Sequence, residues 1–197
     1  MKRVFNMIIV DESGSMCVIE RQALAGINET IETVKKMQQL HPDMEQRISL
    51  LTFDSGHKTF KYDNVKADNV NTLSARDYNP GGGTPLYDAM GFTLTAMRRH
   101  VSEMEDAVVV VTIITDGMEN ASHEYDGAAI KGLVENLRKE GWTFTYMGAN
   151  QDAVEVARHL SIRNSRNFAY SQEGTREMMA KDACTRMNFF TRLWDMK

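Results

Sequence analysis

The run Val108–Ile114 (VVVVTII) constrains the fold of this chain more than any other segment. Its residues are almost all apolar and β-branched, without the polar alternation of a strand that has one face in water. Such a run predicts a strand covered on both faces, as in a parallel sheet that has helices on each side. Other mostly apolar runs at 4–10, 48–53 and 142–147 predict three more strands.

Helical patterns separate these runs. Apolar residues recur at the spacing of one helix face, and the first such helix is expected to end before His41-Pro42. The residues of that first pattern are Leu24, Ile27, Ile31 and Val34. Similar patterns follow near 85–101, 126–140 and 154–160. Alternating strands and helices predict right-handed βαβ units and a doubly wound, mainly parallel central sheet flanked by helices, an α/β fold of Rossmann-like kind.

Phe60 and Tyr62 alternate with charged residues after a turn near Ser55-Gly56, which predicts a half-exposed, antiparallel strand at one edge of the sheet. A short strand at Phe168–Tyr170 and a last helix through about 179–194 are expected to complete the fold. No internal repeat, low-complexity stretch or Pro/Gly/Ser-rich linker divides the 197 residues. We therefore interpret residues 1–197 as a single domain.

The composition excludes several classes of protein. A formal net charge of −4 argues against a general nucleic-acid binder, which needs an excess of basic residues. No apolar stretch reaches the roughly 18 residues of a membrane span, and the short apolar run before Asp11 does not resemble a secretory signal. The two cysteines, Cys17 and Cys184, are expected to be free thiols. These features favour a cytoplasmic protein.

Oxygen-bearing side chains gather in three segments that follow strands or precede a helix. Asp11, Ser13 and Ser15 follow the first strand, Thr84 follows a run of three glycines, and Asp116 follows the strand Val108–Ile114. In doubly wound sheets, ligands bind beyond the carboxyl ends of the strands, where the strand order reverses. Two carboxylates and three hydroxyls at such a place predict an all-oxygen site for a hard cation such as Mg²⁺.

Several neighbouring residues have expected local roles. Thr84 and Pro85 are expected to be the N-cap and the first residue of the following helix. Asp88 is expected either to hydrogen-bond a site residue or to place favourable charge near that helix N-terminus. Four more residues are expected on the rim of the site, namely Glu12, Met16, Glu119 and Asn120.

The set Asp11-x-Ser13-x-Ser15, Thr84 and Asp116 resembles the metal-ion-dependent adhesion site of von Willebrand factor A (vWA) domains. The surrounding segments, GGTPLYDA at 82–89 and ITDG at 114–117, share the resemblance. It implies three hydroxyl ligands and two aspartates that hold the ion, often through water. It further implies that a Glu or Asp of a partner protein supplies the remaining ligand, so that the domain binds rather than catalyses. Mg²⁺ is the expected ion, with Mn²⁺ or Ca²⁺ as alternatives.

The resemblance is to stand-alone intracellular bacterial vWA proteins, which implies a partner such as an ATPase or a stress-response protein encoded nearby. The principal alternative is a Mg²⁺-dependent phosphohydrolase of the haloacid-dehalogenase type, which also places an aspartate after its first strand. Such enzymes need a second aspartate at the place of Ser13. A nucleotide-binding domain is disfavoured because the glycines at 81–83 do not follow the first strand.

Overall fold

The computed structural model describes residues 1–116, 118–148 and 151–167, together with residues 180, 181, 183–185, 187, 188 and 191. The described residues form a six-stranded sheet of order β3-β2-β1-β4-β5-β6. Its strands are β1 (Lys2–Asp11), β2 (Met44–Phe53), β3 (Lys58–Lys66), β4 (Ala107–Ile114), β5 (Thr143–Gly148) and β6 (Asn164–Asn167). The strand expected at Phe168–Tyr170 and most of the expected last helix lie outside the described residues.

The strand pairing confirms the predicted fold class. β1 pairs in parallel with both β2 and β4, and the parallel pairing continues through β5 to β6. β3 pairs antiparallel with β2 and is the one antiparallel strand of this sheet, at its edge. Each of its residues is exposed or partly exposed, which agrees with the half-exposed edge strand that Phe60 and Tyr62 predicted.

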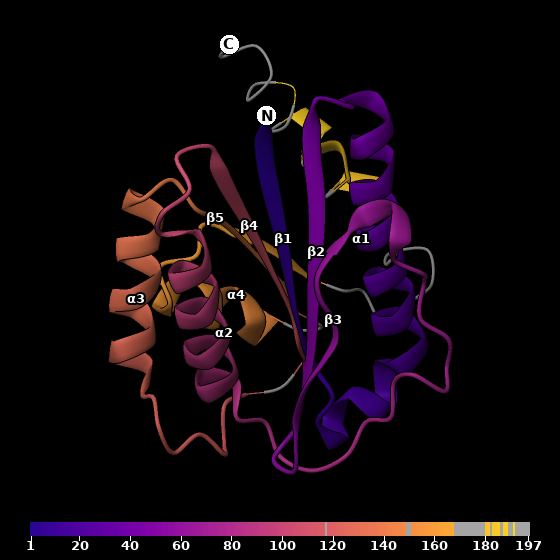
Figure 1. Ribbon diagram of the computed structural model, residues 1–197. Helices are drawn as coiled ribbons and strands as arrows, with labels where there is room; N and C mark the ends of the chain where they lie inside the picture. The colour runs from indigo at the N-terminus through magenta and orange to yellow at the C-terminus, as the bar shows by residue number, and fades with distance from the viewer. Residues whose placement is uncertain are drawn as a thin grey trace.

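Helices cover both faces of the sheet, as Figure 1 shows. The helix α1 (Glu20–Leu40) lies on one face, whereas α2 (Leu86–Val101) and α3 (Gly127–Lys139) lie on the other. The remaining helices are α4 (Gln151–His159) and the short 3-10 helices η1 (Gly14–Ile19) and η2 (Ala67–Asn69). Side chains of β1 alternate between the two layers, because successive residues of a strand point to opposite faces. Phe5, Met7 and Ile9 pack with α2 and α3, and Ile8 and Val10 pack with α1.

The order of the strands reverses beside β1. The chain passes from β1 to β2 on one side, and β4 then pairs with β1 on its other side. At the carboxyl end of this pair Val10 stands opposite Ile114, so Asp11 and Thr115 leave the sheet next to each other. The first strand-end segment and the segment after β4 therefore meet at the place where doubly wound sheets bind ligands.

Two predictions from composition can be compared with the structure. Cys17 and Cys184 are both free, as expected, and both are exposed. Among the described helices, none combines the length and the apolar character that crossing a bilayer requires.

Candidate metal centre

Asp11 ends β1 and is completely buried. Its Oδ1 accepts a hydrogen bond from the backbone N–H of Ser13 at 2.8 Å, and its Oδ2 accepts one from the hydroxyl of Thr115 at 2.6 Å. The hydroxyl of Tyr78 donates to the Asp11 carbonyl at 2.7 Å. Burial raises the pKa of Asp11 to about 6, although the hydrogen bonds from Thr115 and Ser13 act to lower it, and the negative charge of Asp116 adds to the rise. An ionised carboxylate at this position is costly unless positive charge comes close to it.

Three more of the predicted residues lie in one hydrogen-bonded cluster with Asp11. The hydroxyls of Ser13 and Ser15 lie 3.2 Å apart, and the Ser15 hydroxyl donates to Oδ1 of Asp116 at 2.8 Å. Ser13 is buried, Asp116 is half-buried and Ser15 is exposed, so the cluster reaches from the protein interior to solvent. Burial also raises the pKa of Asp116, partly opposed by the hydrogen bond from Ser15. The structure thus brings Asp11, Ser13, Ser15 and Asp116 together.

The loop that carries Thr84 is held next to the cluster by backbone hydrogen bonds, although none of the hydrogen bonds among the described residues joins the Thr84 hydroxyl to the other four residues. The N–H of Gly14 donates to the Gly82 carbonyl at 3.0 Å, and the N–H of Gly81 donates to the Glu12 carbonyl at 2.8 Å. These bonds place the glycine-rich loop against the segment that carries Ser13 and Ser15. Thr84 is itself buried, and its N–H donates to the Asn120 side chain at 2.8 Å. Asn120, expected on the rim, therefore anchors Thr84.

The start of α2 corrects one prediction. The helix begins at Leu86 with Pro85 as its N-cap residue, so Thr84 is not the cap. The N–H groups of the first turn are bound instead by the loop after β4. Tyr87 N–H donates to Glu119 at 2.8 Å, and Asp88 N–H donates to Ser122 at 3.0 Å. Because that loop caps the helix, the Thr84 hydroxyl is not needed as a capping acceptor.

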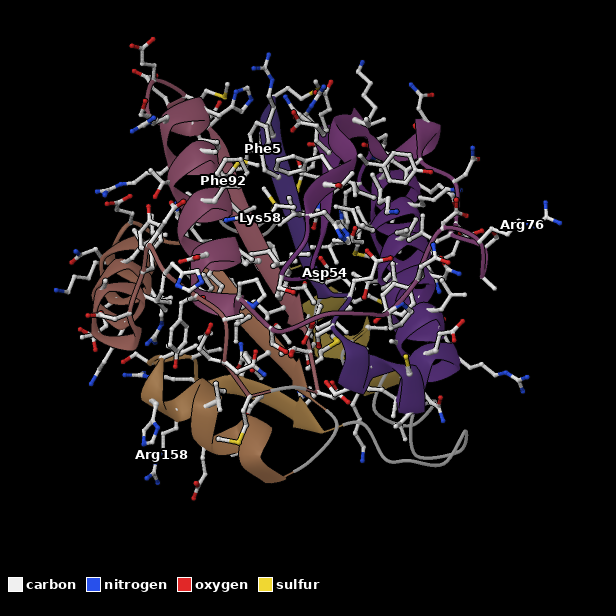
Figure 2. All side chains as sticks on the ribbon, turned by 90° about the horizontal axis from the view of Figure 1, so that it is seen from below. Phe5, Asp54, Lys58, Arg76, Phe92 and Arg158 are labelled. Carbon is white, nitrogen blue, oxygen red and sulfur yellow. The ribbon has the colours of Figure 1, made fainter. Side chains whose placement is uncertain are left out.

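Glu12 and Met16 were expected on the rim, and both are buried. Oε2 of Glu12 contacts Nε2 of His57 at 2.9 Å, while Oε1 accepts the N–H of Asn79 at 2.6 Å. Nδ1 of His57 lies 2.8 Å from Oδ1 of Asp54. Glu12 therefore joins the β1 loop to two neighbouring loops. Figure 2 views the protein from below, with Asp54 near the middle between the α1 and α2 sides.

Asp88 lies in the first turn of α2, so its charge is near the helix N-terminus, as one of its two expected roles required. It bonds to none of the proposed site residues; it is buried and accepts hydrogen bonds from three successive N–H groups, those of His123, Glu124 and Tyr125, each at 2.9 Å. Burial acts to raise the pKa of Asp88, but the three N–H groups outweigh it and hold this pKa below its usual value. Asp88 ties the loop after β4 to α2, and this loop also carries Asn120.

Gly82 provides a test of how the glycine-rich loop is held. Its φ of +69° is a conformation that favours glycine, and an added Cβ would lie 2.7 Å from the hydroxyl oxygen of Ser55. Gly82→Ala is expected to reduce the free energy of unfolding by about 1–2 kcal/mol. Urea unfolding measures the change, with Gly81→Ala as the control because a Cβ at Gly81 meets nothing within 4 Å. Equal stabilities of the two variants would contradict this account of the loop.

The residue types of the cluster suit a hard cation. Two carboxylates and three hydroxyls offer only oxygen, the donor that Mg²⁺ and Mn²⁺ accept in six-coordinate sites. Within the described part of the chain, no group of three His, Cys, Asp or Glu side chains is placed to hold a metal ion. The fit therefore depends on the hydroxyls. The raised pKa values of the buried Asp11 and the half-buried Asp116 mark two carboxylates whose charge a cation would balance.

Comparison with known proteins identifies the family. Residues 7–181 match the model of the von Willebrand factor type A domain, and no curated protein gives a significant match. Among solved structures, the fold is similar to the open pilus adhesin SpaC of Lactobacillus rhamnosus GG, with a TM-score of 0.68 and 15% identity over 94% of this chain and 30% of that chain. It is also similar to the vWF domain of the type V pili tip protein Mfa5 of Porphyromonas gingivalis, with a TM-score of 0.60 and 12% identity over 95% and 96% of the two chains.

A third similar structure is proximal thread matrix protein 1 from the mussel byssus, with a TM-score of 0.58 and 14% identity over 92% of this chain and 45% of that chain. The chain thus spans less than half the length of SpaC and of the mussel protein. At these identities the three likenesses concern the fold. The family model covers most of the sequence and agrees with the strand order described above, so this chain belongs to the von Willebrand factor type A domain family.

Proposed function

We propose that this vWA domain is a divalent-metal-dependent protein-binding module. Its proposed ligands are Asp11, Ser13, Ser15, Thr84 and Asp116, and its proposed ion is Mg²⁺, with Mn²⁺ or Ca²⁺ as alternatives. The observation that carries the proposal is the hydrogen-bonded cluster of Asp11, Ser13, Ser15 and Asp116, which joins two segments about a hundred residues apart at the switch point of the sheet. The carboxylates would hold the ion, and the neutral hydroxyls would complete its coordination.

The donor set favours binding of an anionic group. When bound, the cation supplies positive charge and a coordination position for a carboxylate from a partner protein. Ser13, Ser15 and Thr84 contribute no charge, so the two aspartates are the only charged groups among the proposed ligands. The exposure of Ser15 places the solvent side of the site at that residue. We propose that a Glu or Asp side chain of the partner binds there.

A binding function is also better supported than catalysis. The phosphohydrolase alternative needs a second carboxylate where the chain has Ser13, which is buried against Asp11. The similar structures include a pilus adhesin, a pili tip protein and a thread matrix protein. A cytoplasmic location and a nearby-encoded ATPase or stress-response protein as partner stay predictions from the sequence resemblance.

Thermal unfolding in Mg²⁺ and in EDTA tests the metal site. An ion that binds only the folded state stabilises it by about 2.7 kcal/mol when its free concentration is about 100-fold above Kd, so the wild-type Tm is expected to rise in Mg²⁺. Thr84→Val removes one hydroxyl at similar volume and is expected to weaken Mg²⁺ binding by about 10- to 100-fold.

Thr52→Val is the matched control. Thr52 is a buried threonine of β2 whose hydroxyl has no hydrogen-bond partner within the described part of the protein. This variant is expected to keep the full Mg²⁺ response. A wild-type Tm that is the same in Mg²⁺ and EDTA would exclude the metal site. A Thr84→Val response equal to that of Thr52→Val would exclude Thr84 as a ligand.

A further inference from the structure

The 3-10 helix η1 carries an exposed apolar residue next to the proposed site. In a 3-10 helix, side chains three residues apart lie above one another. Met16 and Ile19 form one such pair, and both are buried in the core. Ser15 and Val18 form another, and both are exposed, Val18 to 74%. Val18 therefore lies on the same face of η1 as Ser15, one turn further along.

A second exposed apolar residue approaches the same place from the segment after β4. Met118 is 65% exposed and follows Asp116 by two residues. The hydroxyl of Ser15 donates to Asp116 at 2.8 Å, and the Asp116 N–H donates to the sulfur of Met16 at 3.2 Å. These bonds hold Asp116, two residues before Met118, against η1. Val18 and Met118 thus lie three and two residues along the chain from the two residues of the Ser15–Asp116 contact, one in each segment.

The other large apolar side chains that the described residues expose are on other elements or at the terminus. They are Met1 at the terminus, Leu40 at the end of α1, Phe92 on α2 and Val154 on α4. Single exposed apolar residues are common on protein surfaces and need no explanation. Val18 and Met118 differ from such single residues because they come from two segments joined by the same polar contact. Together they can offer an apolar surface to a ligand that binds at this contact.

We propose that Val18 and Met118 form an apolar rim that binds an apolar side chain next to the partner's carboxylate. The recognised segment is then an exposed stretch of a partner protein in which Asp or Glu stands next to Leu, Ile, Phe or Met. This inference rests on the proposed function and adds the chemistry of the partner. An apolar neighbour seated on the rim excludes water from the carboxylate, which strengthens its electrostatic attraction in the site. Methionine is flexible and fits side chains of several shapes.

The experiment selects peptides from a phage-displayed random library on the immobilised chain, in Mg²⁺ and in EDTA. Mg²⁺-dependent enrichment of peptides with an acidic residue beside an apolar one is the expected result. The best peptide is then synthesised, and its Kd is measured by fluorescence polarisation. Val18→Ser and Met118→Ser are each expected to raise this Kd by about 3- to 10-fold, since each removes apolar contact area. Leu40→Ser, a distant exposed apolar residue, is expected to leave the Kd unchanged.

The outcomes separate the two proposals. Mg²⁺-dependent enrichment of acidic peptides without an apolar neighbour would overturn the rim and keep the metal-dependent function. So would Kd values for Val18→Ser and Met118→Ser equal to that for Leu40→Ser. Peptides that bind equally in Mg²⁺ and EDTA, or no enrichment in Mg²⁺, would overturn the proposed function and the rim with it.

Discussion

The Asp11→Asn variant is expected to be more stable than the wild type in EDTA at neutral pH and to lose the response to Mg²⁺. The cause is the complete burial of this carboxyl, which raises its pKa from an ordinary 3.8 to about 6. At a pH between these two pKa values, Asp11 is protonated in the folded state and ionised in the unfolded chain. The free energy of unfolding of the metal-free protein therefore falls as the pH rises through this window, by up to about 3 kcal/mol in all. Asparagine has nearly the same shape and carries no charge, so it avoids this loss.

Urea unfolding across pH 4–8 measures the difference between variant and wild type. In EDTA it is expected to grow from near zero at about pH 4 to a stabilisation of up to about 3 kcal/mol at about pH 7. In Mg²⁺ this difference is expected to shrink, because the wild type gains the binding free energy of the ion, whereas the variant lacks a charged ligand and its Mg²⁺ affinity falls by about 100-fold or more. Asp63→Asn, at an exposed position of β3, is the control and should change neither quantity. A variant that is less stable in EDTA, or keeps its Mg²⁺ response, would contradict this account of Asp11.

Most of the fold was predictable because its elements have strong local patterns. The apolar run of β4 indicates a buried strand, and the apolar face of α1 indicates a helix with one buried side. The apolar residues Phe60 and Tyr62 among charged residues in β3 indicate an edge strand. β6 has no such pattern. Its sequence, NSRN, is polar throughout, and it is a strand because it pairs in parallel with β5, Thr145 opposite Asn164. Pairing between β6 and β5 produces no periodic pattern of apolar residues within β6, so the sequence alone does not indicate this strand.

The meeting of Asp11, Ser13, Ser15 and Asp116 was predictable from a rule about strand ends, since both segments follow buried parallel strands. The assignment of these residues to a metal ion stays a prediction. The supporting residues were not predictable, because their partners are distant in sequence. Glu12 contacts His57, 45 residues away, and no local pattern distinguishes it from an exposed rim residue.

The prediction of Thr84 as an N-cap was wrong for a related reason. The residue type and the following proline fit a helix start, but Glu119 and Ser122 supply the acceptors from another loop. Local capping rules assume that a helix end is satisfied by its own neighbours in sequence. Here the loop after β4 supplies the acceptors for the first N–H groups of α2. The position of Thr84 therefore depends on the stability of that loop.

Asp88→Ala is expected to lower the free energy of unfolding by about 3–5 kcal/mol. The substitution removes the acceptor of three backbone N–H groups at once, and each N–H left without a partner away from water costs about 1–3 kcal/mol. Asp126→Ala is the matched control. Asp126 accepts one N–H, that of Ala129, as the N-cap of α3, so its loss is expected to cost about 1 kcal/mol. Urea unfolding of both variants measures the two losses.

The same substitution should also weaken Mg²⁺ binding, although Asp88 is not among the proposed ligands. Once the segment 123–125 is released from α2, Asn120 is no longer held where it accepts the Thr84 N–H. Mg²⁺ affinity, measured by calorimetry below the unfolding temperature, is expected to fall in Asp88→Ala and to stay unchanged in Asp126→Ala. If Asp88→Ala were destabilised but bound Mg²⁺ as the wild type does, the loop after β4 would contribute to the stability of the fold and not to Mg²⁺ binding. A joint loss would show that α2, through one buried carboxylate, holds both the loop and the position of Thr84.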